Sequence, residues 1–555
     1  MRLRTAISIL LIMIIVFAAF YPCLKNGFVN WDDDKYLGQA AVSQNFSLSS
    51  LNQVFSSFTV GHYQPVTILS YMADYQLYKL APFGYHLTNL LLHLANCLLV
   101  FWFIYLISRN TGVSFLTALL FGIHPLRVES VAWVSERKDV LYAFFYLLAI
   151  ISYIYYAFKD KGTKFYLLSL GLFLLSLLSK SMAVTLPLVL LLLDYYLKRK
   201  PFKTALLDKI PYFILSLIMG FIFILCFIFV VGGPRQEIHY GFLSTVSLPA
   251  YGIVFYLGKL LLPIKLSAIY SYYYFQFNQV YFYSIATVIL LMALAIFSLK
   301  YTKKVLFGAL FFLLVIWPTL QFMPSSDIIV ADRYTYLSSI GVFYIAAVFI
   351  SWAYFKWRPN PVFKIGIISL SGLAILSLCL LSFSRCKVWK DGLTLWNDTL
   401  KNYPGIIAYN ARGMIFVGEK DYQRAYQDFN QAAILCQKNS CRHFLDIAGN
   451  RANAEFALGR SKESIDSLNQ LIKLKPDYIP SYLKLAAVYY SLGRHDQAIF
   501  VLKRAIEKNP DSASVYFALG NALMARGDKE IAQEAYRQAI EIDPQYRKVI
   551  NKVSK

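Results

Sequence analysis

Three consecutive carboxylates, Asp32, Asp33 and Asp34, follow the first long apolar run of the sequence after about ten residues. Charged groups this close to a membrane span lie outside the hydrocarbon, where they can hold a cation or a sugar, or take up a proton. A solvated acidic loop is the alternative reading of such a run. We treat the triplet as the first candidate site, with these three residues as candidate catalytic groups.

Three further groups of polar residues lie outside the apolar runs, at residues 62–64, 124–139 and 333–334. An Arg in a short loop between spans suits a lipid phosphate, although pairing of Arg333 with Asp332 is the alternative. The carboxylates of segment 124–139 have salt bridges with neighbouring cations as their alternative. The candidate substrate-binding residues are His62, Tyr63, Gln64, His124, Glu129, Arg137, Lys138, Asp139, Arg333 and Tyr334.

The elements that must position these groups are apolar helices. The chain has 555 residues, of which 58% are hydrophobic, and its apolar runs repeatedly reach the length that crosses ~30 Å of hydrocarbon. The sequence therefore predicts an all-α, polytopic membrane protein in a lipid bilayer. We expect eleven spans, at residues 5–21, 84–107, 113–125, 139–158, 165–180, 182–197, 211–231, 280–299, 305–321, 335–355 and 363–384.

Lys and Arg gather in alternate loops, which places those loops in the cytoplasm. The net charge of +23 fits this topology, so we expect no nucleic-acid partner. The stretch 247–279 is ambiguous, and it is interpreted as not crossing because a crossing would move the basic residues Lys300, Lys303 and Lys304 outside. Eleven crossings that start inside place the C-terminal region on the same outer side as the triplet. An interfacial helix is expected at 66–80.

Beyond Arg385 charged residues become frequent, and a period of 34 residues appears. Pro476, Pro510 and Pro544 are spaced by this period, which is that of tetratricopeptide repeats. We therefore divide the chain into a membrane domain at 1–385, a linker at 386–405 and an α-solenoid of about four repeats at 406–555. Such arrays present concave surfaces that bind peptides or protein partners.

The seven cysteines include no CxxC pair and no Cys/His cluster with metal-ligand spacing. Cys436 and Cys441 follow the first repeat, and they can form a disulfide if the helix breaks between them, as Asn439 and Ser440 suggest. Two unpaired thiols in a repeat core are the alternative.

Taken together, these motifs resemble the transmembrane and tetratricopeptide repeat-containing proteins of the GT-C glycosyltransferase superfamily. The resemblance covers nearly the whole chain. It is carried by residues 26–33, 62–65, 124–125, 129–132, 137–141 and 333–337.

The resemblance implies a protein O-mannosyltransferase-like enzyme that takes a sugar from a polyprenyl-phosphate donor at the extracytoplasmic face. It also implies a base among the triplet, and the spacing Asp-Asp-x-x-Tyr ending at Tyr36 favours Asp32 and Asp33. The chemistry agrees, because an attacking hydroxyl needs a carboxylate and a departing phosphate needs cations. Single displacement would invert the anomeric carbon. The repeats would bind a protein or peptide acceptor or another partner, and the membrane would be a bacterial inner membrane or the endoplasmic reticulum.

Two other functions remain open at this stage. A non-catalytic scaffold would recruit extracytoplasmic partners through its repeats and would tolerate loss of the triplet. A transporter or flippase would carry ionisable residues in mid-span, whereas here the carboxylates concentrate in outer loops. No cofactor is required by any motif, and the carboxylates are compatible with a divalent metal.

Overall fold

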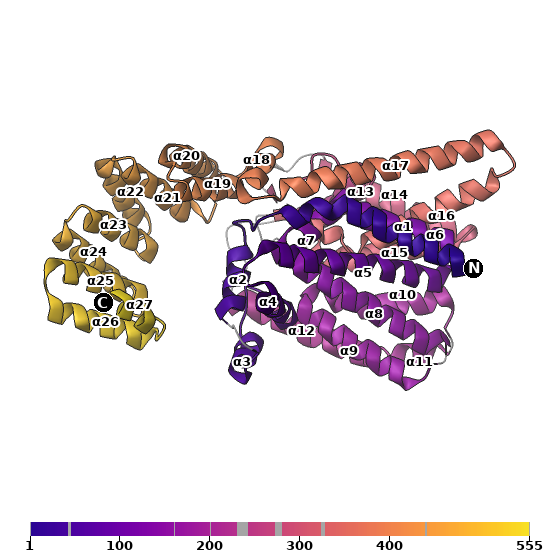
Figure 1. Ribbon diagram of the computed structural model, residues 1–555, viewed down its shortest axis with the longest axis horizontal. Helices are drawn as coiled ribbons and strands as arrows, with labels where there is room; N and C mark the ends of the chain where they lie inside the picture. Colours follow the sequence, from indigo (N-terminus) through magenta and orange to yellow (C-terminus); the bar gives the residue numbers. More distant parts are fainter. Residues whose placement is uncertain are drawn as a thin grey trace. The chain divides into compact units, whose positions relative to one another are not determined.

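The computed structural model describes residues 2–42, 46–159, 161–199, 201–229, 242–271, 280–322, 328–438 and 441–553. The protein is almost wholly helical, as the sequence predicts. A short antiparallel pair joins β1 (Tyr270–Ser271) to β2 (Ile328–Val330). The chain forms two compact units, 1–403 and 404–555, each described here by itself (Figure 1).

Each of the eleven expected spans corresponds to a helix of the first unit. Seven helical segments of the described chain are long and apolar enough to cross a membrane, or eight if the bent pair 111–123 and 125–132 is one span. The eleven crossings and their direction stay predictions. The helices are α1 (Arg2–Phe20), α5 (Pro82–Ser108), α6 (Thr111–Ile123), α8 (Arg137–Lys159), α9 (Thr163–Ser179), α10 (Leu186–Leu197), α12 (Ile210–Phe229), α14 (Val280–Phe297), α15 (Lys303–Ile316), α16 (Ser339–Lys356) and α17 (Pro361–Val388).

Small residues let some of these helices approach closely. A Cβ added to Gly308 of α15 would lie 2.6 Å from the carbonyl oxygen of Gly341 in α16. Only glycine fits at such a distance, as is common where helices pack in membranes. The remaining long helix, α13 (Phe242–Leu261), packs against α14 and contains Pro249. That this stretch of the chain, 247–279, does not cross the membrane stays a prediction.

The expected outer loops are folded into short helices. Pro65 and Pro125 stand at the starts of two of them, where their fixed φ suits a helix and no N–H is needed. The interfacial helix expected at 66–80 is α4, which buries Ile68, Tyr71 and Met72 in a cluster of the first unit. The short helices of these loops are α2 (Asp33–Val42), α3 (Leu48–Ser56), α4 (Pro65–Tyr78), η2 (Pro125–Arg127), α7 (Val128–Ala132), η3 (Val134–Glu136), η4 (Ser181–Thr185) and η8 (Asp332–Thr335). Another short helix, α11 (Phe202–Leu207), lies in a basic loop that is expected inside.

The segment 386–405, expected as a linker, is largely folded against the membrane part. It contains the end of α17 and helix α18 (Gly392–Asn402), whose side chains Leu395 and Trp396 are fully buried. The indole N–H of Trp396 donates to the Asn30 side chain at 2.8 Å. The first unit therefore continues to residue 403.

The second unit consists of four helix pairs and a final helix, as a tetratricopeptide array requires (Figure 1). Small residues let the paired helices meet, since a Cβ on Gly413 would collide with Phe429, and one on Gly520 with Tyr536. The pairs are α19 (Ile406–Gly418) with α20 (Tyr422–Lys438), α21 (Phe444–Ala457) with α22 (Ser461–Leu474), α23 (Ile479–Ser491) with α24 (His495–Lys508), and α25 (Ala513–Arg526) with α26 (Lys529–Ile542), followed by α27 (Tyr546–Val553).

Cys436 and Cys441 form a disulfide with their Cα atoms 4.9 Å apart, so the expected pairing is present in this structure. Helix α20 ends at Lys438, between the two cysteines. The helix break expected at Asn439 and Ser440 falls outside the described residues.

Candidate active site

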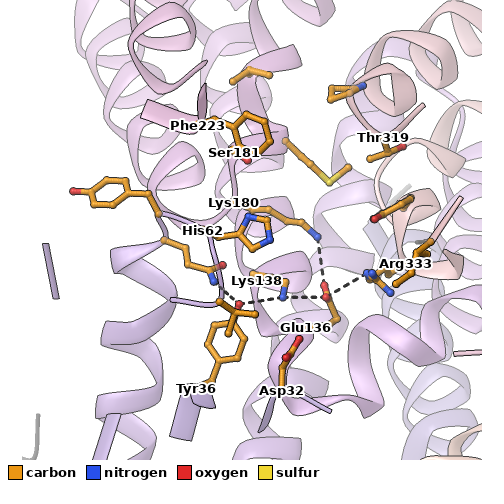
Figure 2. Close-up of a pocket in the computed structure, with 18 of the residues that line it drawn as sticks. Asp32, Tyr36, His62, Glu136, Lys138, Lys180, Ser181, Phe223, Thr319 and Arg333 are labelled. Atoms are coloured by element: carbon orange, nitrogen blue, oxygen red, sulfur yellow. Dashed lines mark hydrogen bonds and ion pairs between the residues drawn. The ribbon is translucent and has the colours of Figure 1, made fainter. Parts of the chain in front are cut away.

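A cavity of about 430 Å³ opens between the short helices that follow α1, α6, α9 and α15. One end is polar and includes Asp32, Tyr36 and Glu136, and the other end includes Phe223 and Thr319 (Figure 2). The lining also includes the apolar side chains of Met182, Val184 and Phe223. The volume lies within the roughly 300–1,000 Å³ of small-molecule sites, and the mixture of an apolar body with a few polar groups is typical of them.

The three carboxylates of the acidic triplet have different environments. Asp32 lines the cavity and accepts a hydrogen bond from Lys35 at 3.1 Å. Asp34 is exposed and does not line the cavity. Only Asp32 can therefore reach a molecule bound there.

Asp33 is buried behind the cavity wall and joins two loops. Its carboxylate accepts hydrogen bonds from the backbone N–H of Val29 at 2.9 Å and from the backbone N–H of Ser135 at 3.0 Å, as well as from the Ser135 hydroxyl. Burial raises the pKa of Asp33 to about 6, and the hydrogen bonds act in the opposite direction. The geometry makes Asp33 an anchor between the loop after α1 and the loop before α8.

Glu136 is the centre of an ionic group on the cavity wall. Its carboxylate oxygens lie 3.0 Å from Lys138 Nζ, 3.3 Å from Lys180 Nζ and 3.4 Å from Arg333 Nε. We name Glu136, Lys138, Lys180 and Arg333 the cavity cluster (Figure 2). With Asp32, the described cavity wall carries three cationic side chains and two carboxylates.

Two more carboxylates hold these cations from behind the wall. Glu129 pairs with the Arg333 guanidinium at 2.5 Å and accepts the backbone N–H of Arg333 at 2.9 Å. Asp139 pairs with Lys180 at 2.5 Å and accepts the Ser130 hydroxyl at 3.0 Å. Neither carboxylate lines the cavity, so both orient cations rather than meet a ligand.

Arg333 does not use its neighbour Asp332 as the ion-pair partner that the sequence left open. Its partners are Glu129 and Glu136, whereas Asp332 accepts a hydrogen bond from Tyr270 at 2.9 Å. Burial raises the pKa of Asp332 to about 6.

Neutral residues complete the polar end. The Tyr36 hydroxyl accepts hydrogen bonds from Gln64 at 2.5 Å and from Lys138 at 3.3 Å. His62, Tyr63 and Tyr334 also line the cavity, as expected for substrate-binding residues.

Arg137 and His124, both expected as substrate-binding residues, lie away from the cavity. Arg137 is fully buried, where it pairs with Asp74 at 2.5 Å and donates to Asn89 at 2.7 Å. His124 is 3.1 Å from the backbone oxygen of Leu260, near the end of α13. Because these groups are used by internal partners, they hold helices together instead of facing a ligand.

Lys180 and Glu136 are the site residues that sequence reasoning did not assign. Lys180 follows α9 immediately, and a lysine at the end of a span reads as a topology signal. Glu136 lies in the candidate segment 124–139, but it was not singled out as a substrate-binding residue, and a salt bridge was its alternative. The sequence did contain a signal for Lys180. It lies at the predicted outer end of the span 165–180, whereas the other loop lysines and arginines gather mostly on the inner side, so its charge has no role in the topology.

An aromatic group supports the loop that carries Asp32. Trp31 stacks on Trp133 with centroids 4.3 Å apart, and Trp133 stacks on Trp389 at 5.6 Å. Trp396 of α18 lies against Trp31 at 5.5 Å. Three segments distant in sequence therefore fix the position of Asp32.

The arrangement can accept a proton at Asp32 and can hold an anionic group at the cations of the cavity cluster. Among the residues that the structure describes, no group of three or more His, Cys, Asp or Glu side chains converges as a metal site. The apolar side chains of the lining can contact a hydrocarbon chain. These features suit an amphipathic anionic ligand better than a soluble polar one.

Comparison with known proteins covers both units. Tetratricopeptide repeat models match residues 452–493, 486–527 and 513–546. The human protein O-mannosyl-transferase TMTC3 is 24% identical over 85% of this chain and 56% of its own length. The F38B6.6 protein O-mannosyl-transferase of Caenorhabditis elegans is 22% identical over 75% of this chain and 62% of its own.

Among solved structures, MamA aligns with 28% of this chain and 84% of its own, at 22% identity and a TM-score of 0.23. The chain spans a little over half the length of the TMTC3 proteins that it matches. The relationship nevertheless runs across the membrane helices and the repeats alike. The chain is thus related over most of its length to the transmembrane and tetratricopeptide repeat-containing proteins, as its motifs predict.

Proposed function

We propose that this chain is a membrane glycosyltransferase that moves a mannose-like sugar from a polyprenyl-phosphate donor to an acceptor hydroxyl. One observation carries the proposal, namely that Asp32 shares a half-apolar cavity with the three cations of the cavity cluster. The names of the relatives, protein O-mannosyl-transferases, support the same reaction class and a protein acceptor.

In the proposed reaction, the acceptor oxygen attacks the anomeric carbon while the bond from that carbon to the phosphate oxygen breaks. Asp32 takes the hydroxyl proton, and the phosphate leaves with the bonding electrons. Lys138, Lys180 and Arg333 stabilise the charge that develops on the leaving phosphate. A single displacement of this kind inverts the anomeric carbon.

The lipid chain of the donor would lie along the apolar wall near Met182 and Phe223. His62, Gln64 and Tyr36 would orient the sugar through hydrogen bonds at the polar end. The repeats would bind the protein or peptide acceptor, since helical arrays of this kind offer concave binding surfaces.

We place the cavity and the repeats at the extracytoplasmic face. The basic loops on the opposite side support this orientation, and a disulfide between Cys436 and Cys441 suits an oxidising compartment. A reporter enzyme fused after Lys555 should be active only outside the cytoplasm. Activity inside would contradict the orientation of the repeats.

The reaction is tested by Asp32→Asn, with Asp34→Asn as its matched control. Asn keeps the shape of the side chain but cannot accept the proton, so we expect transfer to fall by ~10²-fold or more. The measurement is glycopeptide mass spectrometry of a deletion strain that expresses wild-type or variant protein at equal membrane levels. Asp34→Asn should transfer like the wild type, because its side chain is exposed away from the cavity.

Wild-type transfer by Asp32→Asn would contradict the proposed base. If deletion of the gene changes no glycopeptide, while the repeats of the wild-type protein capture partners, the non-catalytic scaffold would be favoured.

A further inference from the structure

A second cavity lies at the other end of the first unit, between α1, α6, α16 and α17. Its volume is about 1040 Å³, at the upper limit of the roughly 300–1,000 Å³ typical of small-molecule pockets. Along α17 its lining runs from Ile367 to Ile375, eight residues that correspond to about 12 Å of helix. The cavity can therefore take part of an acyl chain.

The mouth of this cavity is cationic. Arg4, near the start of α1, and Arg109, in the turn between α5 and α6, both line it, together with the polar residues Asn110 and Thr111. No Asp or Glu lines the cavity, and within the described residues neither guanidinium has a carboxylate partner. Two uncompensated arginines at one opening favour an anionic group, and guanidinium forks match phosphate oxygens.

Deeper in the cavity the walls are apolar. Ile7, Phe115, Leu116 and Ile375 line it there. The space beside Gly372 of α17 is open, because a Cβ built on this residue would meet no atom within 4 Å. An apolar slot of this length, beneath a cationic mouth, is complementary to an acyl chain below a phosphate.

We propose that this cavity binds one anionic phospholipid, with its phosphate at Arg4 and Arg109 and its acyl chains between α6, α16 and α17. The helices α1, α16 and α17 are long and apolar enough to cross a membrane, so the mouth would lie at the headgroup level. The site is separate from the cavity that contains Asp32, with which it shares no lining residue. The lipid would bridge the ends of α1, α6, α16 and α17. Its phosphate would supply the negative charge that the described cavity lining does not provide for Arg4 and Arg109.

The experiment is native mass spectrometry of the full-length protein, purified in detergent, delipidated and titrated with phosphatidylglycerol or with phosphatidylcholine. We expect one phosphatidylglycerol to bind with preference over phosphatidylcholine. Arg4→Gln or Arg109→Gln should each weaken that binding about fivefold, and the double variant about 25-fold, as expected for the loss of one basic contact at a membrane surface each time. Arg358→Gln, which removes an exposed arginine outside the cavity, should bind like the wild type.

A second pair of variants tests the slot without changing charge. Gly372→Leu should block phosphatidylglycerol binding, whereas Gly366→Leu, on the same helix but outside the cavity, should not. Equal binding of the two lipids, or unchanged binding in both the double arginine variant and Gly372→Leu, would overturn the proposal. Displacement by millimolar inorganic phosphate would show a simple anion site, and stronger binding of polyprenyl phosphate would show a donor site. Either result would also overturn it.

Discussion

The first unit contains two buried ionic groups that look alike in their pairing but differ in what surrounds them. The cavity cluster lies on the wall of a 430 Å³ space. The second group, which we name the closed cluster, comprises Tyr153, Asp194, Arg199, Asp208 and Lys209 at the ends of α8 and α10 and the start of α12. No residue of the closed cluster lines either of the two cavities.

In the closed cluster each charged side chain pairs with an opposite charge of the protein. Lys209 is fully buried and pairs with Asp194, whose carboxylate also accepts the Tyr153 hydroxyl at 2.7 Å. Arg199 pairs with Asp208 at 2.5 Å. The cavity cluster instead leaves its cations beside an open space that Asp32 shares. The two clusters show that buried ion pairs alone do not identify a ligand-binding site. A cavity beside the ion pairs is the feature that distinguishes the candidate site.

The sharpest way to test this distinction is Lys209→Met in the closed cluster. Removing Lys209 leaves Asp194 with only its longer ion pair to Arg199 at 3.8 Å, so we expect a loss of about 3 kcal/mol in stability, the lower end of the range for a broken buried pair. The activity of the molecules that remain folded should be unchanged. Thermal unfolding in detergent and specific activity per folded molecule measure the two effects, with the exposed Lys203→Met as control. A large fall in specific activity would break the distinction.

Lys180→Met in the cavity cluster should show the opposite balance. If Lys180 stabilises the leaving phosphate, its removal should lower transfer by about 10²-fold, the size of one lost charge-stabilising donor. Lys180→Arg should recover part of that rate, since it keeps the charge. The exposed Lys164→Met, on the same helix α9, is the matched control. Transfer at the wild-type rate by Lys180→Met would remove this lysine from the mechanism.

The smallest expected effect concerns the aromatic support of Asp32. Trp396→Phe keeps a ring against Trp31 but removes the hydrogen bond to Asn30, a contact worth about 1 kcal/mol. We expect kcat to fall about fivefold with KM for the donor unchanged, because the base is displaced and the donor site is not. Steady-state kinetics on purified protein would show this. A change in KM alone would assign Trp396 to donor binding.

Much of the architecture follows from the sequence because its signals are local. Long apolar runs predict the helices, and the range 84–107 differs from α5 by only a residue or two at each end. A period of 34 residues predicts the repeats. The spacing of Cys436 and Cys441 permits a disulfide but leaves two unpaired thiols as the alternative, and the structure shows the disulfide.

The site was harder to predict because its contacts join segments far apart in the chain. His62, Lys138 and Arg333 were expected in one site and do line one cavity. Arg137 and Lys138 are neighbours in sequence. Arg137 nevertheless binds Asp74 and Asn89 in the interior, whereas Lys138 lines the cavity. Helical periodicity near residue 137 cannot predict which of the two side chains is buried, because the partners of Arg137 come from α4 and α5.

The packing of α18 onto the loop of Asp32 has a consequence for how such proteins can be rearranged. The end of the hydrophobic part, near Arg385, looks like the natural place to exchange one repeat array for another. A junction there would remove Trp389 and Trp396 and uncover Trp31 and Trp133 beside the candidate site. A junction after Tyr403 keeps the whole aromatic group, so viable chimaeras with foreign repeats should tolerate fusion there and fail when joined some twenty residues earlier.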